Sequence, residues 1–395
     1  MQSVVRNVAE LFHRADPSAA FAFELREGGS LVIGREPRVV VSMNSEKALG
    51  TILSRGFVGF GEAYMAGDLN VKGDLQELLR LGIAAHIDTI EVPLHEKVKL
   101  LFAYLNSRNT AKQAARNIAC HYDRGDELYK LYLDSAMAYS CAYFKNDGDS
   151  LEQAQMNKYD HISRKLMLGP NDHLLDLGCG WGGMLIYAAQ QYATKGLGNT
   201  ISQNQYQYAD KKIKSLGLQG RISVRFQDYR DLSGEFDKIV SIGMFEHVGK
   251  KFIPTFMQKV SRLLKKGGLG LLHTIGKDVA TPLDPWINKY IFPGGYLPSL
   301  SEIIHHLSRV GLVVLDVENL RLHYARTLDL WAENFDRNEE EARALFGESF
   351  VRMWRLFLHA SAAAFRYGDN RLYQILFSNG LSNNAPITRE HIYRP

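Results

Sequence analysis

Three glycines near the middle of the chain have the spacing of a nucleotide-cofactor turn. Gly178, Gly180 and Gly183 follow residues 173–177, which have the pattern of a buried strand, and the residues after them have the pattern of a helix. A strand that runs into such a turn lets the backbone approach a ligand closely. Dinucleotide sites and S-adenosylmethionine sites both use this spacing, so the neighbouring residues have to distinguish them.

Those neighbours favour the methyl donor. A dinucleotide site calls for a carboxylate about 20 residues further on, but the strand predicted at 196–201 leads into a turn without an acid. Asp176 would repel a pyrophosphate, whereas it would attract a cationic sulfonium group. A glycine turn that binds nothing is the alternative. We expect the methionine end to contact Asp176, Gly178 and Gly180, the ribose to contact Thr200, Ile201, Ser202 and Gln205, and the adenine to contact Asp228 and Tyr229.

Strand and helix patterns alternate from about residue 162 onward, which predicts an α/β fold with a doubly wound sheet. Ligands of such sheets lie at the carboxyl ends of the strands. The predicted strands are 173–177, 196–201, 222–226, 237–242 and 268–274, and the predicted helices are 182–193, 203–216 and 252–265. The loops at one edge of this sheet would therefore bring together Gly178, Ser202, Asp228, Glu246 and His273.

At 395 residues the chain is long enough for two domains. Residues 21–41 alternate in strand fashion around a turn signal at 27–30, and 46–53 and 75–85 have helical patterns. We expect a smaller α+β amino-terminal domain over 1–105, a polar linker over 106–120 and a catalytic domain over 121–395. An apolar insertion near 276–300 would either roof an acyl tunnel or form a packing lobe.

The amino-acid composition limits the classes of binding partner that the protein can have. A net charge of +4 suits an anionic surface such as phospholipid but falls short of a nucleic-acid-binding signature. Three cysteines without metal-ligand spacing predict neither disulfides nor a metal site. The sequence has no apolar run of membrane-spanning length and does not begin like a signal peptide, so we expect a cytoplasmic protein.

Several separated motifs resemble those of cyclopropane-fatty-acyl-phospholipid synthases and the related mycolic acid cyclopropane synthases. The amino-terminal segment 61–68 resembles the phospholipid-acting branch. The motifs are His121-Tyr122-Asp123, Tyr139-Ser140-Cys141-Ala142-Tyr143-Phe144, Asp176 to Gly183, Thr200 to Gln205, Gly243 to Gly249 and Tyr290 to Gly295.

This resemblance implies a Rossmann-like class I methyltransferase sheet. It also implies methylene transfer from S-adenosylmethionine to the cis double bond of a phospholipid acyl chain. The partners it implies are unsaturated phospholipid at the inner membrane surface, contacted peripherally, and a second copy of the chain in a homodimer.

The resemblance also assigns residues. It implies a bound bicarbonate ion that takes a proton from the transferred methyl group, held by Cys141, Glu246, His273, Ile275 and Tyr324. Its motifs add Tyr139, Ser140 and Cys179 to the cofactor-binding residues. Ser361 stands where the family commonly has a cysteine. From the residues alone, Cys141 would be a small buried side chain and His273 a core histidine.

Two other functions remain open at this stage. A methyltransferase that leaves a methyl group on a lipid or a small molecule would share the whole cofactor site. A lipid-binding module without catalysis would use only the amino-terminal domain and the basic charge. The combination of Glu246, His273 and Tyr324 with the Tyr139–Phe144 motif favours ring closure.

Overall fold

The computed structural model describes residues 2–25, 29–86, 125–383 and 385–393. The expected linker 106–120, the motif at 121–123 and part of the turn at 27–30 lie outside these residues. Contacts divide the chain into two compact units, and each is described here by itself. The first unit contains 1–107, 284–291 and 328–368, and the second contains 108–283, 292–327 and 369–395. The expected boundaries assigned 284–291 and 328–368 to the catalytic domain.

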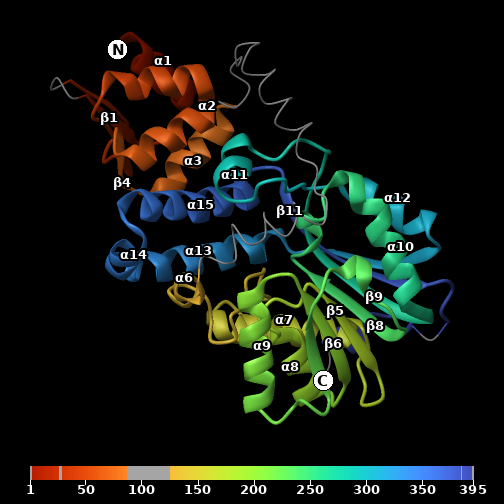
Figure 1. The fold of residues 1–395 in the computed structure, drawn as a ribbon. Helices are drawn as coiled ribbons and strands as arrows, with labels where there is room; N and C mark the ends of the chain where they lie inside the picture. The colour runs from red at the N-terminus through yellow and green to blue at the C-terminus, as the bar shows by residue number, and fades with distance from the viewer. Residues whose placement is uncertain (1, 26–28, 87–124, 384, 394–395) are drawn as a thin grey trace. The chain divides into compact units, whose positions relative to one another are not determined.

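The second unit is built on a seven-stranded sheet with the order β10-β11-β9-β8-β5-β6-β7 (Figure 1). The pairs from β7 to β9 are parallel, whereas β11 is antiparallel to both β9 and β10. The strands are β5 His173–Leu177, β6 Lys195–Thr200, β7 Ile222–Phe226, β8 Phe236–Ile242, β9 Leu264–Lys277, β10 Leu312–Asn319 and β11 Asn370–Asn379. The expected doubly wound α/β fold is therefore confirmed, with an antiparallel edge that the sequence patterns did not predict.

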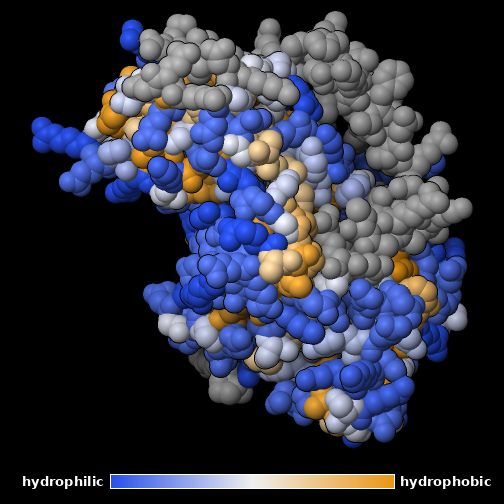
Figure 2. All heavy atoms as spheres, turned by 60° about the vertical axis from the view of Figure 1, so that its left-hand side comes forward, coloured by the Kyte–Doolittle hydropathy of each residue, from blue (hydrophilic) through white to orange (hydrophobic). Residues whose placement is uncertain are grey.

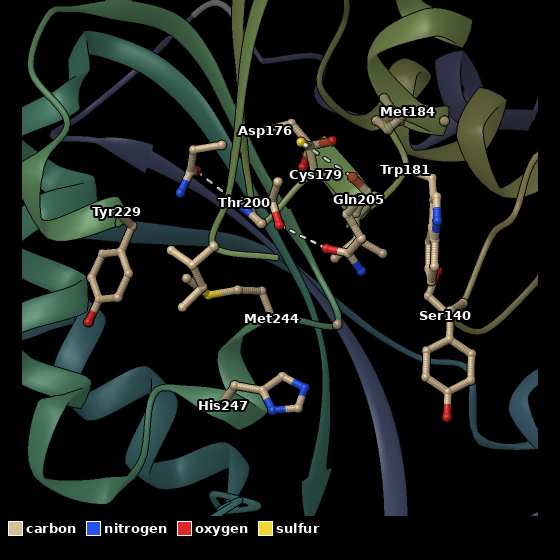
Figure 3. A pocket seen from close by; sticks show the side chains of 18 of the residues that line it. Ser140, Asp176, Cys179, Trp181, Met184, Thr200, Gln205, Tyr229, Met244 and His247 are labelled. Atoms are coloured by element: carbon tan, nitrogen blue, oxygen red, sulfur yellow. Dashed lines mark hydrogen bonds between the residues drawn. The ribbon is translucent and has the colours of Figure 1, made fainter. Parts of the chain in front are cut away.

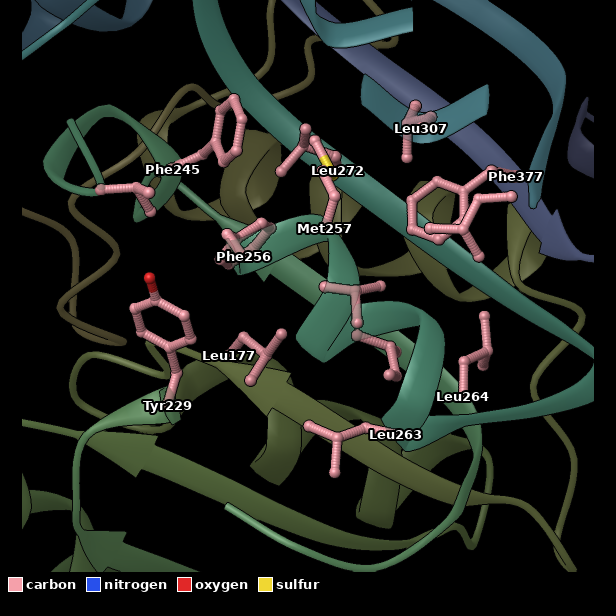
Figure 4. Close-up of a cluster of buried hydrophobic side chains, with 14 of the residues drawn as sticks. Leu177, Tyr229, Phe245, Phe256, Met257, Leu263, Leu264, Leu272, Leu307 and Phe377 are labelled. Atoms are coloured by element: carbon pink, nitrogen blue, oxygen red, sulfur yellow. The ribbon is translucent and has the colours of Figure 1, made fainter. Parts of the chain in front are cut away.

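Helices cover both faces of this sheet. One hydrophobic cluster joins the sheet to α7 Leu151–Lys165, α8 Gly183–Gln191 and α9 Gln203–Ser215. A second cluster, shown in Figure 4, joins it to α10 Ile253–Leu263 and α12 Leu300–Arg309. The unit also contains the short helices α6 Asp126–Lys130 and α16 Glu390–Tyr393 and the 3-10 helices η2 Tyr229–Asp231, η3 Phe245–His247 and η4 Lys250–Phe252.

The apolar pattern of the central strands explains this two-layer covering. Leu174 contributes to one cluster, whereas Leu175 and Leu177 contribute to the other. Successive side chains of a strand point to opposite faces, so a buried parallel strand needs apolar residues on both. Gly198 on β6 lets α8 approach closely, because a Cβ there would lie 2.6 Å from Leu185 Cδ1.

The first unit contains a four-stranded sheet of order β2-β1-β3-β4 and several helices. Arg352 of α15 ties that helix to β4, since its guanidinium donates to the Leu69 carbonyl oxygen over 2.7 Å and to Asn70 Oδ1 over 2.8 Å. The elements are α1 Gln2–Ala15, β1 Phe21–Leu25, β2 Ser30–Ile33, β3 Val39–Met43, α2 Glu46–Ala66, β4 Leu69–Gly73, α3 Leu75–Ala84, α11 Pro285–Tyr290, α14 Glu339–Phe346 and α15 Glu348–Tyr367. Helix α13, Arg321–Arg337, contributes its first residues to the second unit and its later ones to the first.

Two features of the first unit differ from the sequence expectation. Helix α2 continues to Ala66 although the pattern predicted its end at 53, and Gly56 breaks its regularity with φ of +55°. Trp286, expected over an acyl tunnel or in a packing lobe, is fully buried and packs edge-on against Phe57 at 6.0 Å between ring centroids. Its indole is therefore part of a packed core.

Most of the face shown in Figure 2 is hydrophilic, with smaller hydrophobic areas between. Among the described residues, no helix combines the length and the hydropathy that a membrane crossing needs.

Candidate functional site

The glycine turn after β5 has the backbone conformation that its sequence predicts. Gly178 and Gly180 have φ of +78° and +55°, a region that residues with a side chain rarely adopt. Gly182, with φ of +85°, caps the start of α8. A Cβ on Gly178 would lie 2.5 Å from Met244 Cγ. The turn therefore depends on glycine for both its conformation and its space.

A pocket opens at this turn, at the carboxyl ends of the strands (Figure 3). All the expected cofactor-binding residues except Ser202 line it: Tyr139, Ser140, Asp176, Gly178, Cys179, Gly180, Thr200, Ile201, Gln205, Asp228 and Tyr229. Further lining comes from Trp181, Met244 and His247. Trp181 and Tyr229 lie on opposite sides of the pocket in Figure 3.

Ser202 does not line this pocket, but it contacts Gln205, which does. It is fully buried and caps α9, and its Oγ accepts the Gln205 backbone N–H over 3.3 Å. Thr200 Oγ1 donates to Gln205 Oε1 over 2.8 Å, the contact dashed in Figure 3. With its oxygen held this way, the Gln205 amide keeps its NH₂ group available as a donor.

The loop after β7 forms another wall. Asp228 Oδ1 accepts from Arg230 Nε over 2.8 Å, so its carboxylate is already paired with a guanidinium. Tyr229 is buried, and its ring packs edge-on against Phe256 at 5.4 Å between centroids. The loop is therefore held rigidly before any ligand arrives.

Asp176 is a buried carboxyl group at the base of the pocket. Burial raises its pKa to about 7, and the nearby Lys158 ammonium opposes that shift. Its Oδ1 has no hydrogen-bond partner within the described ranges. A cationic group at this place would favour the ionised carboxylate, as the sequence argument requires.

Lys158 is a functional candidate that sequence reasoning missed. Its Nζ donates to Ser140 Oγ over 2.8 Å, and burial lowers its pKa to about 8. On α7 it takes a place in the buried row Ala154–Lys158–Ile162. A lysine between two apolar residues at i−4 and i+4 was the available signal.

A second polar cluster lies where β8 ends beside β9. Glu246 is buried, and its Oε1 accepts the backbone N–H of Ile275 over 2.6 Å. That N–H is open to a side chain because β8 pairs with β9 only as far as Ile242 opposite His273. Burial raises the pKa of Glu246 to about 7, and its Oε2 has no partner in the described part of the chain.

His273 lies two residues before Ile275 on β9 and is also buried. Gln374 Nε2 lies 3.2 Å from its Nδ1, whereas its Nε2 has no partner among the residues described. Burial holds the pKa of His273 well below its ordinary value, so the imidazole is neutral. Three buried side-chain atoms at this end of β9 thus lack a hydrogen bond within the described residues: Glu246 Oε2, His273 Nε2 and, on the paired strand, Gln374 Oε1.

Cys141 and Tyr324 belong to neighbouring segments of the same unit. Cys141 is fully buried, its Sγ donates to the Ala142 carbonyl oxygen over 3.2 Å, and burial raises its thiol pKa. The Ala142 N–H donates to Thr327 Oγ1 over 3.0 Å, which lays this segment against α13, the helix that carries Tyr324. A thiol in this setting does not ionise near neutral pH, so only its backbone remains a candidate ligand.

Two further residues complete the comparison with the expected site. Ser361 is half-buried on α15 and belongs to the first unit. His247, which sequence reasoning did not single out, lines the pocket at the glycine turn, and burial lowers its pKa to about 4. Its place directly after Glu246 in the chain was the signal.

Comparison with known proteins identifies relatives along most of the chain. A family model for mycolic acid cyclopropane synthetase matches residues 109–375, and a model described as a domain of unknown function matches 13–88. A "Probable fatty acid methyltransferase" of Pseudomonas putida is 38% identical, over 94% of this chain and 95% of the relative. The cyclopropane-fatty-acyl-phospholipid synthase of Escherichia coli K12 is also 38% identical, over 93% of this chain and 95% of that protein.

Solved structures agree with these relatives. The crystal structure of the mycolic acid cyclopropane synthase CmaA1, complexed with SAH and CTAB, is 34% identical with a TM-score of 0.64. The similarity covers 67% of this chain and 98% of that one.

Proposed function

Because the chain belongs to the mycolic acid cyclopropane synthetase family and is an S-adenosylmethionine-dependent methyltransferase, we propose a specific reaction for it. It transfers a methylene group from S-adenosylmethionine to the cis double bond of an unsaturated phospholipid acyl chain. The product is a cyclopropane ring, and a bound bicarbonate ion is the proton-abstracting base. The phospholipid substrate is proposed because the similarity to the Escherichia coli enzyme extends through the amino-terminal region.

The reaction places two demands on the protein. The alkene is a weak nucleophile, so it has to be held against the sulfonium methyl carbon while its π pair forms the new C–C bond and the S–C bond breaks. The resulting carbocation then loses a proton from the new methyl group, and that C–H pair closes the ring. Water has to be kept out, because it would trap the cation.

The cofactor pocket answers the first demand. Asp176, Gly178 and Gly180 would hold the methionine end, because the glycines admit close backbone approach and the carboxylate suits a sulfonium cation. Tyr139, Ser140 and Cys179 line the same pocket and join the proposed binding residues. Gln205 and the turn from Thr200 to Ser202 would contact the ribose, and Asp228 with Tyr229 the adenine.

The observation that carries the proposed base is the pair of unpartnered buried atoms in the second cluster. Glu246 Oε2 is an acceptor, and the neutral His273 can present a donor at Nε2. Together with the Cys141 backbone and the Tyr324 side chain, they would bind an anion that both donates and accepts a hydrogen bond. The Ile275 N–H already donates to Glu246 Oε1, so it would have to leave that contact to reach the anion. Bicarbonate has this chemistry, and when bound it would supply the base. Glu246 would accept a hydrogen bond from the hydroxyl group of bicarbonate and so fix its orientation.

A methyl-branched product is the second candidate, because a relative with 38% identity is named as a fatty acid methyltransferase. Mass spectrometry after incubation with unsaturated phospholipid vesicles and S-adenosylmethionine separates the two. Ring closure adds one CH₂ and removes the alkene, as ozonolysis of the product would show. A product that retains an alkene, or one with a methyl branch, would reject ring closure.

The proposal includes where the enzyme acts. Residues 1–105 would engage the membrane surface peripherally and support a homodimer, on the cytoplasmic side of the membrane. The support for the amino-terminal role is the family match at residues 13–88. The net charge of +4, which favours anionic lipid, belongs to the full chain and not to residues 1–105. Vesicle flotation of the full chain should weaken as salt rises, since screening removes this attraction. Flotation that is indifferent to both salt and anionic lipid would contradict the role, and sedimentation would test the dimer.

A further inference from the structure

Gln374 is a side-chain hydrogen-bond partner of His273 within the described residues, and the two residues face each other across paired strands. β11 runs antiparallel to β9, and the register places Gln374 directly opposite His273. Side chains of directly opposed residues lie on the same face of the sheet. Both residues are 1% exposed, so no bulk water competes for their contact.

The chemistry of the amide decides where the imidazole proton lies. Gln374 Nε2 is 3.2 Å from His273 Nδ1, and an amide nitrogen donates but does not accept. Nδ1 is therefore the acceptor in this pair. A neutral imidazole carries one proton, which must then sit on Nε2, the nitrogen without a described partner.

We propose that Gln374 is a positioning residue that fixes His273 in the Nε2–H tautomer, so that the buried cluster presents a hydrogen-bond donor to its anion. The inference rests on the proposed function for the identity of that anion. The opposite tautomer would turn an imidazole lone pair toward an anionic oxygen, and the two would repel. Glu246 supplies the complementary acceptor, because its Oε1 is already engaged by Ile275 and only Oε2 remains.

This arrangement gives the cluster its selectivity. One fixed acceptor and one fixed donor suit an anion with a single hydroxyl group, whereas a fully deprotonated anion would oppose Glu246. Gln374 acts only through the orientation of the His273 proton. It therefore controls recognition of the anion without belonging to the cofactor pocket.

Nitrogen-15 NMR of the full chain with labelled histidine tests the tautomer directly, in buffer free of bicarbonate. His323 is a reference in the same spectrum, because its Nδ1 accepts the Phe144 backbone N–H over 3.0 Å and its tautomer is thereby fixed. Wild-type His273, assigned by the signal lost in His273→Gln, should show the same Nε2–H pattern as His323. An Nδ1–H pattern for His273 would overturn the proposal without any variant.

Variants of Gln374 extend the test. In Gln374→Glu the carboxylate can only accept a hydrogen bond from the imidazole. His273 should therefore change to the Nδ1–H form or become protonated on both nitrogens, while His323 stays unchanged. Gln374→Leu removes the contact and should give a mixture of both tautomers. Gln153→Glu adds the same charge at an exposed position of α7 and should leave His273 as in the wild type. An unchanged His273 in Gln374→Glu would reject the positioning role.

Bicarbonate titration then separates this inference from the proposed function. Gln374→Glu should weaken bicarbonate binding by roughly tenfold or more, because a donor is exchanged for a lone pair. S-adenosylmethionine affinity, measured by calorimetry, should stay within about twofold, since Gln374 does not line that pocket. If the tautomer changes as expected but wild-type turnover ignores bicarbonate, the proposed base fails and the role of Gln374 stands. If bicarbonate stimulates turnover but His273 carries its proton on Nδ1, the proposed base stands and the role of Gln374 fails.

Discussion

The proposed cofactor pocket and the Glu246–His273 cluster lie in the same unit, yet they differ in how many of their polar groups already have hydrogen bonds. In the pocket, Thr200, Gln205 and Asp228 have side-chain partners, and Asp176 Oδ1 lacks one among the described residues. In the cluster, Glu246 Oε2 and His273 Nε2 are buried without one. An unsatisfied buried polar atom costs free energy of about 1–3 kcal/mol, so each of these two atoms favours a bound hydrogen-bonding partner.

The comparison also separates two ways of building a site. The pocket is shaped by missing side chains, since Gly178 and Gly180 leave the space and the backbone conformation that a ligand needs. The cluster is shaped by proton positions, because burial keeps His273 neutral and moves the pKa of Glu246 to about 7. Binding at the first site should therefore be lost when a side chain is added. Function at the second site should be lost when a single hydrogen-bond donor or acceptor is exchanged.

The largest effect is expected from Gly178→Val. The new side chain would meet Met244, whose Cγ lies 2.5 Å from the Cβ position, and φ of +78° would strain any residue with a Cβ. Calorimetric titration should show no S-adenosylmethionine binding. Gly180→Ala is the matched control, because φ is +55° there but nothing lies within 4 Å of the Cβ position, so its loss should be smaller. Unchanged affinity in Gly178→Val would remove the assignment of this turn.

Glu246→Gln should impair the Glu246–His273 cluster and so lower turnover. The amide can still accept the Ile275 N–H through its oxygen, but its NH₂ group would meet a hydroxyl as a second donor. We expect turnover to fall by about 10²- to 10⁴-fold, the usual range for loss of acid–base function. Cofactor affinity should change little. Turnover that is indifferent both to this change and to removal of bicarbonate would exclude the proposed base.

Tyr324→Phe should have a milder effect on the same step. It removes one hydrogen bond to a charged acceptor, which corresponds to about 1.5–3 kcal/mol, or roughly 10- to 150-fold in turnover. Steady-state kinetics at saturating S-adenosylmethionine would measure it. A loss as large as that of Glu246→Gln would show that Tyr324 does more than hold the anion.

The pH dependence of stability tests the buried state of Glu246 without any substrate. Its pKa is raised to about 7 in the folded protein, from an ordinary value of 4.5. As pH rises from 4.5 to 7, the unfolded chain releases this proton before the folded one, so the group's contribution to stability decreases. The Glu246→Gln variant has no titrating group at this position, so it does not lose this contribution to stability. Its stability relative to wild type should rise through that window and level off above pH 7, by up to about 3 kcal/mol.

Urea unfolding of both proteins in bicarbonate-free buffer measures this difference. Asp176, whose pKa is also about 7, is present in both proteins and cancels. A difference that stays flat from pH 4.5 to 7 would show that Glu246 is solvated.

Sequence patterns were sufficient for the parallel part of the fold. Strands β5 and β7 begin and end where the sequence patterns predicted. The central strand β5 is buried over Leu174–Leu177, whereas the edge strand β7 alternates at Ile222–Val224 between buried and exposed residues. The patterns missed the antiparallel β10 and β11 and the extent of β9. Strand β11 is paired with residues about a hundred positions away, and such pairing leaves no local signal.

By itself the sequence determined the glycine turn and the strand-end loops, and hence part of the lining of the proposed cofactor pocket, because a turn with positive φ and a period of two or 3.6 are local properties. Only the tertiary structure decided that Lys158 donates to Ser140, that Ile275 supplies its N–H to Glu246 and that Gln374 faces His273. These contacts join elements far apart in the chain, and their effect depends on burial. Desolvation, which sets the pKa of Asp176 and Glu246 and keeps His273 neutral, exists only when the core has closed around them.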